Sequence, residues 1–292
     1  MTDSSRLPTV TRFAPSPTGL LHLGHAFAAL VAYRIAADAS GLFHLRMEDI
    51  DTGRCRPEYE AAAKDDLEWL GLSWPEPVMR QSERFDAYRE ALDTLQTLGA
   101  VYPCFCTRKD IQAEIERAVA APHILTDGPD GPLYPGTCRR LADADSKRRI
   151  AEGENFALRL RMDEAIAAAG PLTWTDSQGR TVTATPEIFG DVVVARKDVP
   201  TSYHLAVVVD DDALGVTLVT RGDDLRPSTH VHTLLQALLG LKRPIYHHHR
   251  LILGPDGKKF SKRDRSVTLR QLRESGVSRD DVIARTGFTP AE

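Results

Sequence analysis

Apolar side chains along this 292-residue chain recur either at the helical spacing of three and four positions or in short runs and alternations typical of strands. Apolar side chains three and four positions apart predict amphipathic helices at 26–37, 58–70, 82–99 and 229–239. Short apolar or alternating runs predict strands at 9–11, 42–47, 156–162, 191–195, 203–209 and 214–220. Helices and strands alternate in the first and last parts of the series, so we expect an α/β fold.

The helical stripes also predict core residues. Gly71 follows the helix at 58–70 and is expected to cap its C-terminus. The predicted core side chains of the helices at 58–70 and 82–99 are Leu67, Trp69, Leu70, Phe85, Tyr88, Leu92, Leu95 and Leu98.

The middle of the chain has a different character. Residues 121–135 are rich in Pro and Gly, so no regular element is expected there. Residues 172–175 and 181–184 predict a hairpin, which together with the neighbouring strands makes a β-rich insertion. The tail, 268–292, predicts one or two short helices.

Composition places few limits on function. Hydrophobic content of 42% and charged content of 27% are ordinary for a globular protein, and no apolar run is long enough to span a membrane. The first residues lack a secretory pattern, and there are only four cysteines, so we expect a reducing, cytoplasmic setting and no membrane partner. The net charge of −4 means that any nucleic-acid contact must come from local basic groups.

A candidate phosphate site lies where the first strand meets the first helix. Pro15, Pro17 and Gly19 predict a tight turn, and His22 and His25 then lie three apart on the first helical turn. The N–H groups and dipole at a helix N-terminus favour an anion, so two imidazoles there suit a polyphosphate. A helix cap with two solvated histidines explains the same residues.

Charged residues follow two of the predicted strands. Glu48 to Asp51 come after the strand at 42–47, and Arg221 to Asp224 come after the strand at 214–220. Ligands of open α/β sheets bind at this edge, so the carboxylates could hold an ammonium group or a metal. For Glu48 to Asp51, a solvated turn that caps the next helix remains the alternative.

Three cysteines and a tyrosine form a candidate metal site. Cys104, Cys106 and Cys138 offer three thiolates, and Tyr134 or a water could complete a tetrahedral Zn²⁺ site. Buried, unreactive cysteines are the alternative. Cys55 is set apart and is read as a bystander.

The segment 251–263 is the last candidate. Gly254 and Gly257 allow a turn, and Lys258, Lys259, Lys262 and Arg263 gather cationic groups that could close over phosphates. An exposed basic patch is equally consistent. The nearby 247–249 run of three histidines is expected to be structural or solvated, because consecutive residues of a strand point to opposite faces.

Taken together, the His22 to His25 turn and the Lys259 to Arg263 segment resemble the two signature motifs of class I aminoacyl-tRNA synthetases. Segments 12–19, 45–51, 67–72, 81–84 and 254–259 narrow the resemblance to the glutamyl and glutaminyl branch. Within that branch the chain is most similar to the glutamyl-Q tRNA(Asp) synthetase family.

The resemblance implies a Rossmann-type parallel-sheet catalytic domain with a zinc-bearing α+β insertion and a short helical C-terminal segment. The expected division is 1–101 for the first half of the catalytic domain, 102–190 for the insertion, 191–250 for the second half, and 251–292 for the signature loop and helical segment.

The resemblance also implies a site. His22, His25 and Lys262 would bind ATP and act in catalysis. Cys104, Cys106, Tyr134 and Cys138 would hold one structural Zn²⁺. The residues implied to bind L-glutamate are Arg12, Phe13, Ala14, Pro15, Ser16, Glu48, Tyr203 and Arg221.

The implied reaction is ATP-dependent activation of glutamate, with Mg²⁺, followed by transfer to queuosine in the anticodon loop of tRNA(Asp). Phe260, Arg263 and Leu23 depart from the signature motifs, but Lys262 and both histidines remain. Only 29 residues follow Arg263, too few for the anticodon-binding domain of glutamyl-tRNA synthetases, so we expect the RNA to be held differently. We also expect a monomer. The basic residues expected near that RNA are Arg108, Lys109, Arg139 and Arg140.

Three other functions stay open at this level. A truncated glutamyl-tRNA synthetase would charge tRNA(Glu). A non-catalytic RNA-binding module would lack glutamate-dependent pyrophosphate exchange. A small-molecule nucleotidyltransferase shares the first histidine motif, but the later basic segment and long insertion fit it poorly.

Overall fold

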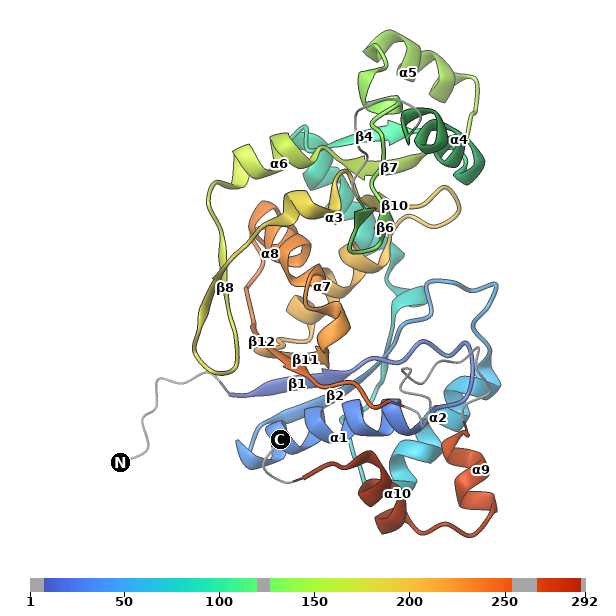
Figure 1. The fold of residues 1–292 in the computed structure, drawn as a ribbon, viewed down its shortest axis with the longest axis vertical. Helices are drawn as coiled ribbons and strands as arrows, with labels where there is room; N and C mark the ends of the chain where they lie inside the picture. Colours follow the sequence, from blue (N-terminus) through green and yellow to red (C-terminus); the bar gives the residue numbers. More distant parts are fainter. Residues whose placement is uncertain (1–7, 120–126, 254–266, 290–292) are drawn as a thin grey trace.

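The structure is a computed structural model that describes residues 8–119, 127–253 and 267–289 (Figure 1). Its centre is a parallel sheet. Strand β1 (Val10–Phe13) pairs with β2 (Leu42–Met47), which pairs with β3 (Met79–Arg80), and β11 (Leu218–Gly222) pairs with β12 (Ile245–His249). The N–H of Thr217 donates to the carbonyl of Val10 over 3.0 Å, which brings β11 alongside β1.

Helices cover both faces of this sheet, as Figure 1 shows. On one face lie α1 (Leu23–Asp38), α2 (Pro57–Trp69), α9 (Leu269–Glu274) and α10 (Arg279–Thr286), which share a core with β1 and β2. On the other lie α3 (Phe85–Thr97), α7 (Tyr203–Ala213) and α8 (Ser228–Leu238), which form a second core. Apolar strand residues are therefore buried on both sides.

The middle of the chain is built on an antiparallel sheet of order β10-β7-β4, formed by Val193–Ala195, Ala157–Leu160 and Val101–Cys104. The helices around it are α4 (Arg108–Val119), α5 (Asp143–Ala151) and α6 (Met162–Ala169). Two hairpins complete it, β5 (Asp127–Gly128) with β6 (Gly131–Pro132), and β8 (Thr173–Thr175) with β9 (Thr181–Thr183). The short 3₁₀ turns within the described ranges are Gln81–Glu83, Cys138–Arg140, Pro186–Phe189 and Asp223–Leu225.

Most predicted elements are confirmed. The helices at 26–37, 58–70 and 229–239 appear as α1, α2 and α8, and the helix at 82–99 appears as a 3₁₀ turn followed by α3. The strand at 42–47, the hairpin across 176–180 and the two short helices of the tail are also present. The expected α/β fold with a parallel sheet is therefore correct.

The predicted strand at 203–209 is wrong, because these residues form the first two turns of α7. Both sides of this helix are covered, so His204 through Val208 are all buried and show no amphipathic contrast. An apolar run of this length cannot be distinguished from a buried strand by periodicity alone.

Smaller errors concern element ends. The strand expected at 214–220 begins only at Leu218, because Leu214 caps the C-terminus of α7. Leu98 was expected in the core, but it is the C-cap residue of α3 and is 50% exposed. The Pro- and Gly-rich stretch contains the two-residue strands β5 and β6, which are too short to leave a pattern in sequence.

In the described residues, no helix combines the length and the apolar character needed to cross a membrane.

Candidate active site

Three arginines meet at the carboxyl ends of neighbouring parallel strands. Arg12 lies on β1, Arg46 on β2 and Arg221 on β11, and they are 8%, 0% and 7% exposed. Arg12 donates from Nη1 to the carbonyl of Thr220 over 2.9 Å, which ties β1 to β11 at this edge. The parallel register therefore concentrates positive charge where open α/β sheets bind ligands.

Asp211, near the end of α7, neutralises part of that charge. Its Oδ1 accepts from Arg12 Nε over 2.9 Å and from Arg46 Nη1 over 2.5 Å. Although burial alone would raise the pKa of Asp211, the two guanidiniums lower it below its ordinary value. The carboxylate is therefore held ionised between two strands.

Glu48 lies one residue beyond β2 and accepts from Arg46 Nη2 over 3.0 Å. Burial raises the pKa of Glu48, and Arg46 opposes that rise. The N–H of Glu48 donates to the carbonyl of Pro15 over 3.0 Å, so the acid is anchored to the turn that follows β1. Glu48 is thus a partly accessible acid beside a cationic cluster.

Arg221 differs from the other two arginines in its partners. It donates to His232 Nδ1 over 3.0 Å, to Thr229 Oγ1 over 2.5 Å and to His248 Nε2 over 3.3 Å. In the part of the chain that the structure describes, no acidic side chain pairs with it. Its positive charge is therefore buried among neutral acceptors.

The two histidines of the first motif stand together at the start of α1. His22 is the N-cap and its Nδ1 accepts from the N–H of Gly24 over 3.1 Å, while Nδ1 of His25 accepts from the N–H of His22 over 3.2 Å. Their ring centroids are 3.8 Å apart. Since Nδ1 accepts in both neutral rings, the proton of each lies on Nε2, which makes both imidazoles donors suited to phosphate oxygens.

The structure places the other expected site residues as follows. Phe13 and Pro15 are buried, Ala14 and Ser16 are half-buried, and all four lie on the segment that leads from β1 towards α1. Tyr203 opens α7, and burial raises its pKa. Lys262 lies outside the described residues, as does most of the expected basic segment.

The four expected metal ligands converge at the end of β4. The sulfur atoms of Cys104, Cys106 and Cys138 all lie within 4.8 Å of one another. The hydroxyl of Tyr134 lies 3.4 Å from the sulfurs of Cys104 and Cys106. This donor set, three thiols and a phenol around one point, fits a closed tetrahedral site for a thiophilic cation.

Hydrogen bonds within this cluster already favour a thiolate. The bond with Cys104 lowers the pKa of the Cys138 thiol to about 6, and the same bond, with burial, raises the pKa of Cys104 to about 12. The N–H of Phe105 also points at Cys138 Sγ over 3.4 Å. Cys55, expected to be a bystander, lies outside the cluster.

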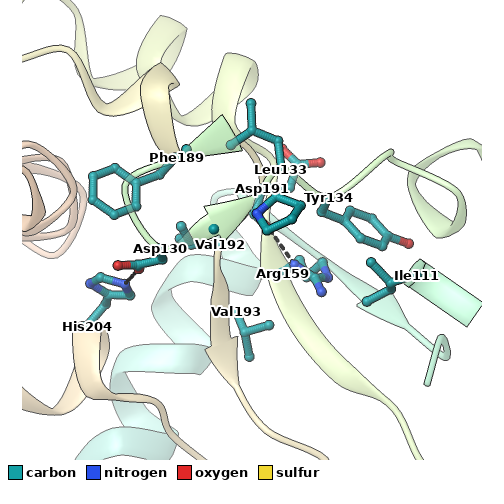
Figure 2. Close-up of a pocket in the computed structure, with 13 residues that line it drawn as sticks. Ile111, Asp130, Leu133, Tyr134, Arg159, Phe189, Asp191, Val192, Val193 and His204 are labelled. Carbon is teal, nitrogen blue, oxygen red and sulfur yellow. Dashed lines mark hydrogen bonds and ion pairs between the residues drawn. The ribbon is translucent and has the colours of Figure 1, made fainter. Parts of the chain in front are cut away.

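A cavity of about 300 Å³ is lined by residues of the insertion, among them Tyr134, and by His204 of α7 (Figure 2). Tyr134 and Arg159 line one part of it, with the guanidinium 3.8 Å from the centroid of the tyrosine ring. Asp130 and His204 line another part, with Asp130 Oδ2 3.3 Å from His204 Nε2. The cavity thus adjoins both the insertion and the helix that carries Asp211.

The four basic residues expected near RNA are in different situations. Arg108 and Lys109 are exposed at the start of α4. Arg139 donates to Asp163, Glu164 and Asp191 over 3.1, 2.6 and 3.4 Å, so its charge is compensated within the insertion. Arg140 is exposed and its Nη1 donates to the carbonyl of Pro135.

Sequence reasoning missed a group of buried polar residues behind this site. Arg46 and Asp211 belong to the cationic cluster, and Asp210 accepts from Gln81, Arg84 and Tyr88. The available signal was the acidic run 210–212 directly after an apolar segment, which is unusual for a buried element. With strands predicted at 203–209 and 214–220, the acids 210–212 fell between two elements and were not considered as buried residues.

Comparison with known proteins gives a consistent picture. Residues 8–292 match the family model described as "tRNA synthetases class I (E and Q), catalytic domain". A glutamyl-Q tRNA(Asp) synthetase of Rhodobacter capsulatus is 48% identical over 287 residues, which span 96% of this chain and 100% of the relative. The protein of the same name from Symbiobacterium thermophilum is 44% identical over 95% of this chain and 85% of its own.

Longer relatives match over part of their length. A glutamate–tRNA ligase of Aquifex aeolicus is 38% identical over 97% of this chain and 58% of its own. The crystal structure of a glutamate tRNA ligase from Elizabethkingia meningosepticum in complex with its amino acid superposes with a TM-score of 0.72 at 31% identity, covering 88% of this chain and 52% of that one. The sheet and its helices are therefore shared with these enzymes.

Proposed function

Because this chain belongs to the glutamyl-Q tRNA(Asp) synthetases, within the class I tRNA synthetases of the glutamyl and glutaminyl type, we propose the following two-step reaction for it. It activates L-glutamate with ATP. An oxygen of the glutamate α-carboxylate attacks the α-phosphorus of ATP. The bond between the α-phosphorus and the oxygen that bridges to the β-phosphorus breaks, pyrophosphate leaves, and glutamyl-adenylate forms. A hydroxyl of the cyclopentenediol of queuosine, in the anticodon loop of tRNA(Asp), then attacks the glutamyl carbonyl, and AMP leaves as the hydroxyl proton is lost.

The observation that carries the proposal is the uncompensated charge of Arg221. Among the described residues, this cluster contains the buried cations Arg12, Arg46 and Arg221 and the anions Asp211 and Glu48, so it has one positive charge in excess. Glutamate carries two carboxylates and one ammonium and has one negative charge in excess. The amino acid therefore completes the charge balance of the cluster.

The expected glutamate ligands fit distinct parts of the substrate. The guanidinium of Arg221 pairs with the side-chain carboxylate, because a planar fork of N–H donors matches two carboxylate oxygens. Glu48 accepts from the substrate ammonium. Tyr203 and the segment Arg12, Phe13, Ala14, Pro15 and Ser16 form the walls around the amino acid.

ATP binding is assigned to the start of α1. His22 and His25 donate to phosphate oxygens at a helix N-terminus, where the backbone dipole also favours negative charge. Lys262 stabilises the charge that develops on the leaving phosphates, and Mg²⁺ accompanies the nucleotide. The assignment of Lys262 rests on the sequence resemblance alone.

Cys104, Cys106, Tyr134 and Cys138 would hold one Zn²⁺, whose role is to stabilise the insertion. Coordination by these four residues would join the end of β4 to the turn at Cys138. No step of the reaction involves this metal. We keep the division into 1–101, 102–190, 191–250 and 251–292 as part of the proposal.

We also propose that the protein works as a cytoplasmic monomer that binds tRNA(Asp) carrying queuosine. Of the expected basic residues, Arg108, Lys109 and Arg140 are the better candidates for phosphate contacts, because Arg139 is paired with three acids. Phosphate contacts of this kind position an RNA without reading its sequence.

The test is glutamate-dependent exchange of pyrophosphate into ATP, measured with and without RNA. We expect exchange without RNA, followed by transfer of labelled glutamate to queuosine-bearing tRNA(Asp). Label on the 3′ end of tRNA(Glu) would instead favour a truncated glutamyl-tRNA synthetase. Absence of exchange under both conditions would favour a non-catalytic module. The higher identity to glutamyl-Q relatives, 48% against 38% for the Aquifex ligase, supports the first outcome.

A further inference from the structure

A continuous chain of side chains leads from Arg221 to the surface of the insertion. Arg221 Nη1 lies 3.0 Å from His232 Nδ1, and His232 Nε2 lies 3.2 Å from His204 Nδ1. His204 Nε2 lies 3.3 Å from Asp130 Oδ2, the contact drawn as a dashed line in Figure 2. The chain therefore joins β11, α8, α7 and the β5–β6 hairpin.

The two ends fix the direction of every hydrogen bond in this chain. A guanidinium offers only donors and a carboxylate offers only acceptors. His232 must then accept at Nδ1 and donate from Nε2, and His204 must do the same, so both rings are neutral and carry their proton on Nε2. Burial and the nearby Arg221 lower the pKa of His232 well below 6.5, in agreement with a neutral ring.

We propose that His232 and His204 are positioning residues that hold Arg221 for the substrate carboxylate, and that Asp130 anchors them from the insertion. This inference rests on the function proposed above. Asp130 lies in the turn between β5 and β6 and is exposed, whereas His204 and His232 are 8% and 2% exposed. The hairpin of the insertion is thereby connected to the amino-acid pocket.

Neutral histidines suit the positions next to Arg221 better than acidic residues would. An acid in the place of His232 would neutralise Arg221 and compete with the substrate carboxylate. A neutral imidazole orients the guanidinium by a hydrogen bond and leaves its charge for the ligand. Thr229 and His248 are also neutral. They accept hydrogen bonds from Nη2 and Nε of Arg221, and so orient the guanidinium without neutralising its charge.

The first experiment removes the anchor. Because Asp130 is exposed, Asp130→Ala leaves the fold intact. It raises the KM for glutamate in the exchange assay about 2- to 10-fold, the effect of losing one hydrogen bond, and leaves the KM for ATP unchanged. Asp130→Asn keeps an acceptor oxygen and returns the KM towards the wild-type value. Asp127→Ala is the matched control, because it removes an exposed carboxylate from the same hairpin that takes no part in the hydrogen bonds from Arg221 to Asp130.

The second experiment acts on the buried ring. His232→Leu removes the acceptor of a charged donor and raises the KM for glutamate about 10- to 100-fold. His232→Asn keeps an acceptor near the position of Nδ1 but loses the link to His204, so its KM falls between those of the wild type and His232→Leu. Equal KM values for Asp130→Ala, Asp127→Ala and the wild type would overturn the role of the anchor.

A measurement that does not depend on enzyme activity tests the hydrogen bonds from Arg221 to Asp130 separately from the proposed reaction. ¹⁵N spectra of histidine-labelled protein should show His204 and His232 as Nε2–H tautomers, and Asp130→Ala should shift the His204 and His232 resonances while Asp127→Ala does not. A wild type that shows these tautomers but no glutamate exchange would refute the function and keep the hydrogen-bond chain. Nδ1–H tautomers, or signals insensitive to Asp130→Ala, would overturn the chain even in an active enzyme.

Discussion

The guanidinium of Arg12 donates two hydrogen bonds to the carboxylate of Asp211, with Nε 2.9 Å from Oδ1 and Nη2 3.3 Å from Oδ2. The two residues are 199 positions apart in the chain. Their pairing joins the first strand to α7 and compensates the charge of Arg12. It therefore leaves Arg221 as the guanidinium suited to the substrate side chain.

The first prediction concerns the stability of this cluster. Asp211→Asn should lower the free energy of unfolding by about 3 to 5 kcal/mol, because it leaves Arg12 and Arg46 buried without their shared acid. Denaturant unfolding measures the change. Asp212→Asn is the control, since its side-chain oxygen accepts from the N–H of Lys242 at the surface and an amide can do the same. Equal losses in the two variants would contradict the ion-pair argument.

The second prediction concerns amino-acid selectivity. An unneutralised, buried Arg221 should reject the neutral amide of glutamine, so exchange with glutamine should be slower than with glutamate by about 10-fold or more. Arg221→Lys keeps the charge but loses the planar fork, and it should raise the KM for glutamate more than the KM for ATP. Arg226→Lys, at an exposed ion pair with Asp223, is the matched control. Glutamine exchange at the glutamate rate would refute the assignment.

The third prediction concerns the metal. Freshly purified protein should contain about one zinc per chain, and Cys138→Ser should lose the metal and melt at a lower temperature, because a thiolate ligand is removed from a closed site. Elemental analysis and thermal melts measure both effects. Cys55→Ser should retain zinc and melting temperature, since Cys55 is not in the cluster. A melting temperature indifferent to chelator and zinc addition would count against a structural metal.

The fourth prediction concerns the pH dependence of stability that the buried carboxyl group of Asp66 causes. Burial raises the pKa of Asp66 to about 6, although Arg273 opposes the rise. Asp66 is 0% exposed on α2, and in the described residues its oxygens have no hydrogen-bond partner. Because the folded-state pKa lies above the unfolded value, the folded state gains protons first, and this group makes the protein less stable as pH rises from about 4 to 6.

Asp66→Asn should therefore raise the free energy of unfolding by about 1 to 3 kcal/mol at pH 8 and by little at pH 4. Asp65→Asn, at the exposed neighbouring position, should show no such dependence. Urea unfolding of the three proteins at the two pH values measures the difference. A stabilisation that is the same at both pH values would show that charge burial is not its cause.

The fifth prediction concerns Lys262, which lies outside the described residues and is assigned from the resemblance. Lys262→Ala should reduce kcat of the exchange reaction about 100- to 1000-fold, with a much smaller change in the KM for glutamate, because the ammonium acts on charge that develops in the transition state. Steady-state kinetics with both substrates measure the split. A kcat within a few-fold of the wild type would remove this residue from the mechanism.

The sequence by itself determined the elements whose pattern is local. The helices α1, α2 and α8 and the strand β2 lie where the sequence predicted them, and Gly71 follows α2 as expected. The family was also decided at this level, because residues 12–25 and 259–263 combine specific residue types at specific spacings in the right order. The convergence of Cys104, Cys106, Tyr134 and Cys138 was predicted from that family and agrees with the geometry.

Only the tertiary structure decided the conformation of α7 and the partners of the buried charges. Tyr203–Ala213 is covered on nearly every side, so its sequence lacks the polar face that marks a helix. The contact of Asp211 with Arg12 and Arg46, and the chain from Arg221 to Asp130, join residues that are up to 199 positions apart. Such contacts leave no local signal, because they depend on how strands and helices from distant segments pack against one another.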